Sequence, residues 1–165
     1  MKTPMNLFRT VALAASIALA TLFTAPLAHA TSLTDFLENA LINHLFRATA
    51  YTAPTTLYFR LNTTTCSDAV SGTEVTGGSY LRVAYVSGTT AWAATSGSNG
   101  TTSNSNAIAF ATPTVSWGTV LSFELMDALS AGNSLICQAL TQSKTINIGD
   151  TVTFPAASVT VQIDN

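Results

Sequence analysis

Hydrophobic positions follow three different patterns along the chain. Residues 1–30 contain a nearly continuous apolar run, "VALAASIALATLFTAPLA". Residues 31–50 place apolar side chains at i, i+3, i+4 and i+7, which is the spacing of an amphipathic helix. Over residues 51–165, apolar and polar residues alternate in short runs, which is typical of strands. The pattern therefore predicts a leader segment, an N-terminal helix and a single β-domain with these boundaries.

The β-domain is predicted from many short runs with a period of two. In the first two runs the residues expected to face inward are Leu57, Phe59 and Leu61 of "TLYFRLN" and Leu81, Val83 and Tyr85 of "YLRVAYV". Tyr58 and Arg60 then fall on the opposite face. The other candidate strands are "TAWAA", "AIAFAT", "VLSFELMD", "SLICQAL", "TINI", "TVTF" and "SVTVQID". Such runs, separated by turns about 8–12 residues apart, predict an antiparallel β-sandwich or barrel of roughly eight or nine strands.

The predicted helix, "TSLTDFLENALINHLFRAT", has one apolar stripe. The stripe consists of Leu33, Phe36, Leu37, Ala40, Leu41 and Leu45. Ser32 and Asp35 resemble a capping box at its start. Two arrangements remain open. The helix packs across the domain's own sheet, or it docks on a neighbouring subunit, for which Ile42 and Phe46 widen the apolar surface. In the second arrangement the interface consists of Phe36, Leu37, Leu41 and Leu45.

The leader segment has the order of a secretory signal peptide. Lys2 and Arg9 give a positive start, the apolar run follows, and Ala28 and Ala30 mark a cleavage site. An N-terminal membrane anchor is the alternative, but polar residues and Pro26 interrupt the run. After cleavage, no segment approaches the roughly 20 apolar residues of a membrane span. We therefore expect a secreted protein, located outside the cell or at the cell surface.

Composition after the leader changes the picture in two ways. Four basic residues remain against eight carboxylates, a net charge of −4, whereas nucleic-acid binding would need clustered Lys and Arg. Ser, Thr, Asn and Gly must cover the surface instead, and "SGSNGTTSNSN" (96–106) predicts a mobile polar loop. The two cysteines, Cys66 and Cys137, predict a disulfide in an exported chain, with two buried free thiols as the alternative.

No residue pattern predicts catalysis. The one histidine after the leader, His44, lies on the predicted helix, and there is no GxSxG sequence. "DALSAGN" (127–133) lacks the acidic spacing of a calcium loop and is interpreted as a hairpin turn. A hydrolase would need two of the carboxylates Glu74, Glu124 and Asp127 to converge in a pocket. We therefore predict that the protein is not an enzyme and has no metal site and no cofactor.

The segment "GTEVTGGSYLRVAYV" (72–86) carries a charged loop. Its "TGGSY" lacks the lysine of a phosphate-binding loop and precedes a strand rather than a helix. Gly77 and Gly78 suit a turn with positive φ. Glu74 and Arg82 lie on either side of that turn and can pair, within one subunit or across two. An exposed pair contributes only about 0–1 kcal/mol, so we expect this one to affect assembly more than folding.

Three segments resemble the small tail-fibre-like structural proteins of bacteriophages. They are GTE-GG-Y-R (Gly72, Glu74, Gly77, Gly78, Tyr80, Arg82), F-x-x-P-x-x-x-W-G-x-V (Phe110, Pro113, Trp117, Gly118, Val120) and G-D-x-x-x-F-P-A (Gly149, Asp150, Phe154, Pro155, Ala156). The resemblance implies a non-enzymatic β-module that assembles on a larger particle. The predicted signal peptide and the paired cysteines do not fit a protein assembled in the cytoplasm, so we interpret the chain as an exported variant.

These observations lead to two hypotheses. In the first, the chain is a structural subunit of an extracellular fibre or filament and assembles with copies of itself. In the alternative, it is a secreted adhesin or carbohydrate-binding module that contacts glycans at a cell surface through Trp92, Trp117 and Tyr80. The strand entry "SWGTV" makes a packing role more typical for Trp117.

Overall fold

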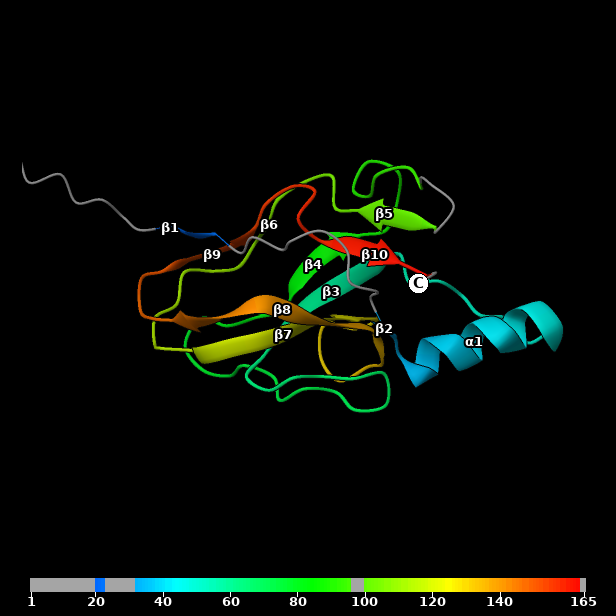
Figure 1. Cartoon of the computed structure of the whole chain (residues 1–165), viewed down its shortest axis with the longest axis horizontal. Helices are drawn as coiled ribbons and strands as arrows, with labels where there is room; N and C mark the ends of the chain where they lie inside the picture. Colours follow the sequence, from blue (N-terminus) through cyan, green and yellow to red (C-terminus); the bar gives the residue numbers. More distant parts are fainter. Residues whose placement is uncertain (1–19, 23–31, 96–99, 164–165) are drawn as a thin grey trace, which may run out of the picture.

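The computed structural model describes residues 20–22, 32–95 and 100–163. Within these ranges the fold is mainly β, with ten strands and one helix (Figure 1). In chain order the elements are β1 (Ala20–Leu22), β2 (Ser32–Leu33), α1 (Asp35–Phe46), β3 (Thr56–Asn62), β4 (Val83–Val86), β5 (Thr101–Ser103), β6 (Ile108–Ala109), β7 (Gly118–Met126), β8 (Ser134–Ile146), β9 (Thr151–Phe154) and β10 (Thr160–Gln162).

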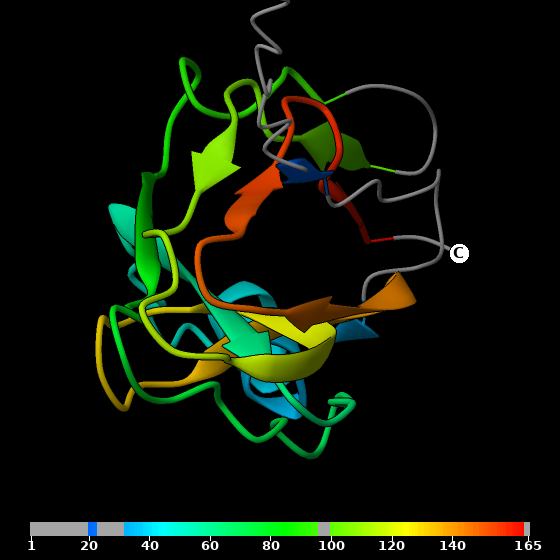
Figure 2. The same ribbon diagram turned by 90° about the vertical axis from the view of Figure 1, so that its left-hand side faces the viewer.

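Antiparallel pairing dominates the sheets. The largest sheet has five strands in the order β2-β8-β7-β3-β4, β9 joins β1 and β6 in a second sheet, and β10 pairs with β5. Only β1 and β9 are parallel among the described pairs. The five-stranded sheet lies on one side of the core and the smaller sheets on the other, and they do not close into a barrel (Figure 2). The predicted mainly-β antiparallel fold with one helix is confirmed in its sandwich form.

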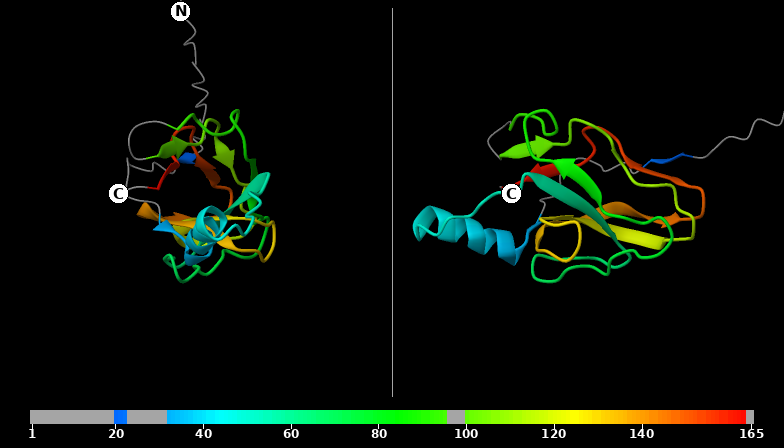
Figure 3. Two further views of the ribbon diagram at one scale, coloured as in Figure 1. Left: turned by 90° about the vertical axis from the view of Figure 1, so that its right-hand side faces the viewer. Right: turned by 180° about the vertical axis from the view of Figure 1, so that it is seen from behind.

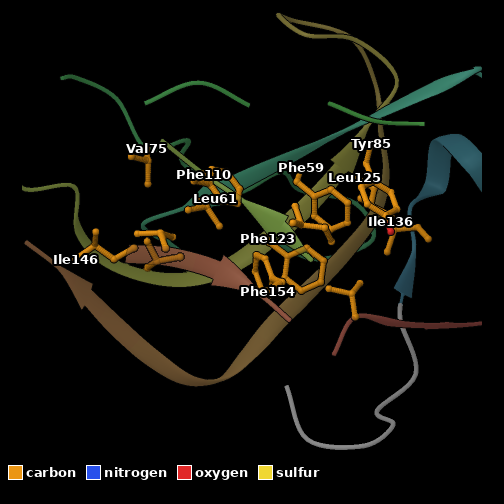
Figure 4. Close-up of a cluster of buried hydrophobic side chains, with 14 of the residues drawn as sticks. Phe59, Leu61, Val75, Tyr85, Phe110, Phe123, Leu125, Ile136, Ile146 and Phe154 are labelled. Carbon is orange, nitrogen blue, oxygen red and sulfur yellow. The ribbon is translucent and has the colours of Figure 1, made fainter. Parts of the chain in front are cut away.

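Aromatic side chains join the two layers in the core. Phe59 of β3, Phe123 of β7 and Phe154 of β9 are almost completely buried and lie against one another (Figure 4). Their ring centroids are 5.9 Å apart for Phe59 and Phe123, 6.1 Å for Phe59 and Phe154, and 5.1 Å for Phe123 and Phe154. Burying each such side chain stabilises the fold by about 1.5–3 kcal/mol, so this cluster holds the small sheet on the large one.

The central strands are buried on both faces, which the period-two pattern did not predict. Arg60 of β3, predicted to fall on the opposite face, is 8% exposed, and Glu124 of β7 is 0% exposed. The loop between β3 and β4 folds over this second face. It begins with a bond from Thr63 N to Thr73 O of 2.8 Å and returns through a bond from Val75 N to Leu61 O of 2.9 Å. Along β3 and β7, the polar face of the large sheet is therefore an interior surface.

Several predicted strands have different limits in the structure. β4 begins at Val83, so Leu81, predicted to face inward, is 70% exposed. "TAWAA" forms no strand beyond an isolated bridge between Trp92 and Asn104. "SLICQAL" and the first two residues of "TINI" belong to one long strand, β8, which ends at Ile146. Its register with β7 moves from Val120↔Lys144 to Ser122↔Ala139, so residues 140–143 bulge from the sheet.

Within the polar segment 96–106, predicted to be a mobile loop, one asparagine anchors the part that the structure describes. Residues 96–99 lie outside the described residues, whereas β5 occupies Thr101–Ser103. Asn104 is fully buried, and its side chain donates to Pro155 O at 2.8 Å and accepts from Val159 N at 2.8 Å. The amide of Asn104 therefore holds the C-terminal segment in place, a role that the long polar run did not indicate.

Helix α1 starts later than predicted. Its N-cap is Thr34, whose hydroxyl accepts from Leu37 N at 3.5 Å, whereas Ser32 of the proposed capping box belongs to β2. All of its residues are described and none is buried, although Leu37 packs against the core at its edge. The helix extends away from the sheets at one end of the molecule (Figures 1 and 3). It therefore does not lie across the domain's own sheet.

The predicted leader is described only at Ala20–Leu22, which pairs with Thr151–Thr153 as β1. The predicted cleavage residues, Ala28 and Ala30, lie outside the described residues. Within the part of the chain that the structure describes, no helix is long and apolar enough to cross a membrane.

Candidate functional site

The glycine turn brings the charged loop against the segment that precedes Trp117. Gly77 and Gly78 have φ values of +94° and +55°, and Tyr80 N donates to Gly77 O at 3.2 Å. A Cβ atom on Gly78 would lie 2.8 Å from both Thr114 Oγ1 and Val115 Cγ2. Glycine is therefore required there twice, for its conformation and for the close approach of a second chain segment.

Arg82 connects the loop to the β7–β8 hairpin. Its Nε and Nη2 atoms donate to Glu74 Oε1 and Oε2 at 2.8 and 2.7 Å, and its Nη1 donates to the carbonyls of Ala128 and Ala131, each at 2.8 Å. The hydrogen bonds with Glu74 raise the pKa of Arg82. Arg82 is only 9% exposed. The expectation of an exposed pair is thus wrong, because the guanidinium fills the space between loop and hairpin.

Tyr80 occupies the centre of the same group. Its hydroxyl accepts from Leu61 N at 2.9 Å and donates to Glu74 Oε1 at 3.4 Å. Burial raises the pKa of Tyr80 far above its usual value, so the phenol stays neutral. Its ring contacts Trp117 edge to face at 5.2 Å. Trp117 is 3% exposed, so it is a packing residue and offers no face to a sugar ring.

The predicted motif residues therefore form one cluster. Glu74, Gly77, Gly78, Tyr80, Arg82 and Trp117 surround the joint between the 72–86 loop, the segment before β7 and the β7–β8 hairpin. The hairpin itself has the predicted turn: Asp127 Oδ1 and Oδ2 accept from Asn133 N and Nδ2 at 2.7 and 2.8 Å.

A second, deeper ion pair lies beside this cluster, and the sequence analysis missed it. Arg60 Nη2 donates to Glu124 Oε2 and to Gly72 O, while Asn62 Nδ2 donates to Glu124 Oε2 at 2.8 Å. Burial by itself raises the pKa of Glu124, but the hydroxyl of Ser134, the charge of Arg60 and the amide of Asn62 together bring it below its usual value. Arg60 and Glu124 are direct cross-strand partners, a pairing that a correct β3–β7 register would have revealed.

Each of the three candidate carboxylates is held by a partner within the fold. Glu124 is fully buried, Glu74 is paired with Arg82, and Asp127 accepts bonds within its hairpin. His44 Nδ1 accepts from Tyr51 N at 3.2 Å at the edge of α1. Among the described residues, no three His, Cys, Asp or Glu side chains gather in the manner of a metal site. The contacts of the cluster join the 72–86 loop to the β7–β8 hairpin.

The disulfide is confirmed. Cys66 and Cys137 are bonded, with their Cα atoms 5.8 Å apart. The bond ties the 63–74 segment to β8 at the position where β8 pairs with Ser32 of β2. It therefore fixes the covering loop next to the start of α1.

Two hollows flank the β7–β8 hairpin. One, of about 310 Å³, lies over the motif cluster and is lined by Glu74, Val75, Thr76, Gly77, Tyr80, Leu81, Arg82, Leu129, Ser130 and Ala131. The other, of about 260 Å³, lies at the start of α1 and is lined by Thr34, Asp35, Phe36, Ser67, Asp68, Ala69, Ser71, Gly132, Asn133 and Ser134. Exposed apolar side chains stand at both, among them Leu81 and Phe36. This end of the molecule thus combines hollows with apolar rims.

Comparison with known proteins identifies the family. A family model described as "Podophage GP4 fiber I protein gp80" matches residues 32–162, from β2 to the end of β10. No curated protein sequence matches the chain. The match includes the motif cluster, the disulfide and α1, and its description is that of a structural fibre protein. The predicted resemblance to phage fibre proteins is therefore confirmed: the chain belongs to the podophage GP4 fiber I protein gp80 family.

Proposed function

We propose that the protein is a non-enzymatic structural subunit of an extracellular fibre, assembled from copies of itself and located outside the cell or on its surface. Family membership supports the fibre-associated role. The observation that carries the self-assembly is the exposure of α1. Ile42, Leu45 and Phe46 are 53%, 69% and 76% exposed, at i, i+3 and i+4 on one face. An apolar helical face of this kind suits docking on another subunit.

The energetics of α1 support the same proposal. A helix of about 12–15 residues is marginal in water unless tertiary contacts stabilise it. α1 spans Asp35–Phe46, and only its first turns touch the sheets, mainly through Leu37. Contact with a neighbouring subunit would supply the burial that the described residues of the chain do not provide.

The sheet edges suit assembly less well than the helix does. β2 and β6 are two residues long, and β8 carries a bulge at residues 140–143 followed by Lys144. Short strands, bulges and edge lysines all hinder strand-to-strand association between molecules. We therefore place the main subunit contacts on α1 and the neighbouring hollows rather than on the edges of β2, β6 and β8.

Export is the second part of the proposal. Residues 1–30 act as a signal peptide that is cleaved after Ala30, and this cleavage removes β1 from its place beside β9. The formed Cys66–Cys137 disulfide supports this because such bonds persist in oxidising compartments. The family match begins at residue 32, so it leaves the whole leader outside the fibre-protein region.

Two measurements on the full-length gene product test the proposal. After expression in a cell with a secretory pathway, the intact mass of the exported protein should correspond to a chain that starts at Thr31. The purified protein should then form oligomers in sedimentation velocity and filaments in negative-stain electron microscopy. A monomer at high concentration, with no filaments, would contradict the structural role. A cytoplasmic chain with an intact N-terminus would contradict export.

A further inference from the structure

The two ends of α1 have complementary surfaces. The start of the helix lies beside the 260 Å³ hollow, whose rim includes Asp35, Phe36 and Asp68. The far end of the helix presents Leu45, Phe46 and Arg47, which are exposed. One end thus offers an acidic hollow with an apolar rim, and the other offers an aromatic side chain followed by a cation.

The hollow is preformed by bonds from three chain segments. Thr34 N donates to Leu135 O at 3.1 Å, Thr34 Oγ1 donates to Ser134 O, and Asp35 N donates to Asp68 O at 3.1 Å. The nearby Cys66–Cys137 disulfide fixes the segment that carries Asp68. A rigid hollow loses little conformational entropy when it is filled, which favours binding.

Charge distinguishes this hollow from the rest of the surface. Asp35 and Asp68 are exposed, and none of the described residues that line the hollow is basic. Arg47 is exposed, and among the described residues its guanidinium has no carboxylate within ion-pair distance. With only four basic residues outside the predicted leader, a free arginine beside an exposed phenylalanine is a specific feature.

We propose that the hollow at the start of α1 receives Phe46 and Arg47 from α1 of a second copy of this chain. The Phe46 ring packs against Phe36 at the rim, and the Arg47 guanidinium pairs with Asp68 and Asp35. This inference rests on the proposed self-assembly and names the surfaces that perform it. If each of two copies inserts its Phe46 and Arg47 into the other, the two α1 helices form a closed antiparallel pair with favourably opposed helix dipoles. If each copy inserts into the next one, the contact builds an extended fibre of subunits.

A charge exchange tests the contact. In the exported full-length product, R47E and D68R should each weaken self-association by about tenfold or more, because each places like charges together. The double variant R47E/D68R should recover at least about threefold of the lost association, since the pair of residues 47 and 68 is re-formed with reversed polarity, while Asp35 beside the new carboxylate at position 47 keeps the rescue incomplete. F46A should weaken association by a similar factor because it removes the aromatic anchor. Sedimentation velocity over a concentration series measures all four.

Lys144→Glu is the matched control. It makes the same charge change as R47E on β8, away from both ends of α1, and should leave association unchanged. Circular dichroism should show every variant folded, because Phe46, Arg47 and Asp68 are exposed.

The outcomes separate this inference from the proposed function. If the unmodified protein assembles and the double variant shows no rescue, or R47E and F46A assemble normally, the docking contact is wrong while the fibre role stands. If the unmodified protein is monomeric, the self-assembly itself is wrong. If the single variants remain self-associated but fail to join the native fibre, the hollow receives a different fibre protein, which overturns the assignment to a second copy.

Discussion

Four charged side chains form a neutral network between the large sheet and its covering loop. Arg60 and Glu124 pair in the interior, Arg82 and Glu74 pair nearer the surface, and Arg60 Nη1 lies 4.0 Å from Glu74 Oε2. Buried charges are tolerated only when they are paired and hydrogen-bonded, because desolvation costs several kcal/mol per ion. The network therefore adds little net stability over apolar packing, but it fixes the path of the loop.

Removal of one member should be costly. Arg82→Ala leaves the Glu74 carboxylate and the carbonyls of Ala128 and Ala131 without their shared donor. We expect the free energy of unfolding to fall by about 3 kcal/mol. This value lies at the low end for a broken buried pair because water can reach the Glu74 carboxylate. The stability of Arg82→Lys should lie between that of the unmodified protein and that of Arg82→Ala, because an ammonium group cannot form the same planar fork. Urea unfolding monitored by tryptophan fluorescence measures the loss.

The exposed Arg47→Ala is the control for that series and should change the free energy of unfolding by less than about 0.5 kcal/mol. An Arg82→Ala protein as stable as this control would mean that the joint is only a turn.

Glu124 should make the free energy of unfolding depend on pH in the acidic range. Its folded-state pKa is lowered, so the folded state binds a proton less readily than the unfolded chain does. The stabilisation is fully present above the ordinary value of 4.5 and is lost as pH falls below it toward the folded-state pKa. Urea midpoints measured from neutral to acidic pH should therefore decline below that value. Glu124→Gln should be less stable at neutral pH and flatten the decline, and an unchanged acid slope would contradict this assignment.

At the scale of elements, strands were predictable where apolar alternation decided them. The limits of β3 and β9 agree with "TLYFRLN" and "TVTF" to the residue. The fate of the alternate positions was not predictable, because Arg60 and Glu124 are buried by a loop whose path depends on Arg82 and the disulfide. Leu81 gives the opposite case. It has the correct alternation with Val83 and Tyr85, but β4 begins two residues after it, at Val83.

The existence of α1 could be predicted from the sequence, but its direction could not. Its apolar stripe was recognised from spacing, and its dimensions follow from the residues between Thr34 and Arg47. Its direction does not, because that depends on Thr34 bonding to Ser134 and Leu135 across the sheet. The members of the motif cluster were also recognised, whereas the packing of Tyr80 between Trp117 and Phe110 required the fold.

At the scale of the whole molecule, one covalent bond connects the covering loop, the long strand and the start of the helix. Cys66 and Cys137 are 71 residues apart in sequence, so the bond restricts the unfolded chain over nearly half its length. In the chain-entropy treatment a loop of this size stabilises the folded state by about 4 kcal/mol. A β-domain with a neutral buried network and an unpacked helix depends strongly on such a constraint.

Removing the bond should therefore have a global effect and a local one. C66S/C137S should lose about 4 kcal/mol of unfolding free energy, and the reduced unmodified protein should lose a similar amount, because both release the same loop. Locally, Asp68 is two residues from Cys66 and accepts the Asp35 amide hydrogen bond. Hydrogen exchange should accelerate more at the amide of Asp35 than at the amide of Phe59 in the core. Without the cross-link, the segment that carries Asp68 can separate locally from the start of α1. Equal acceleration at both sites would show that the disulfide acts only by restricting the unfolded chain and does not hold the start of α1. Other contacts would then have to keep the hollow at the start of α1 in shape.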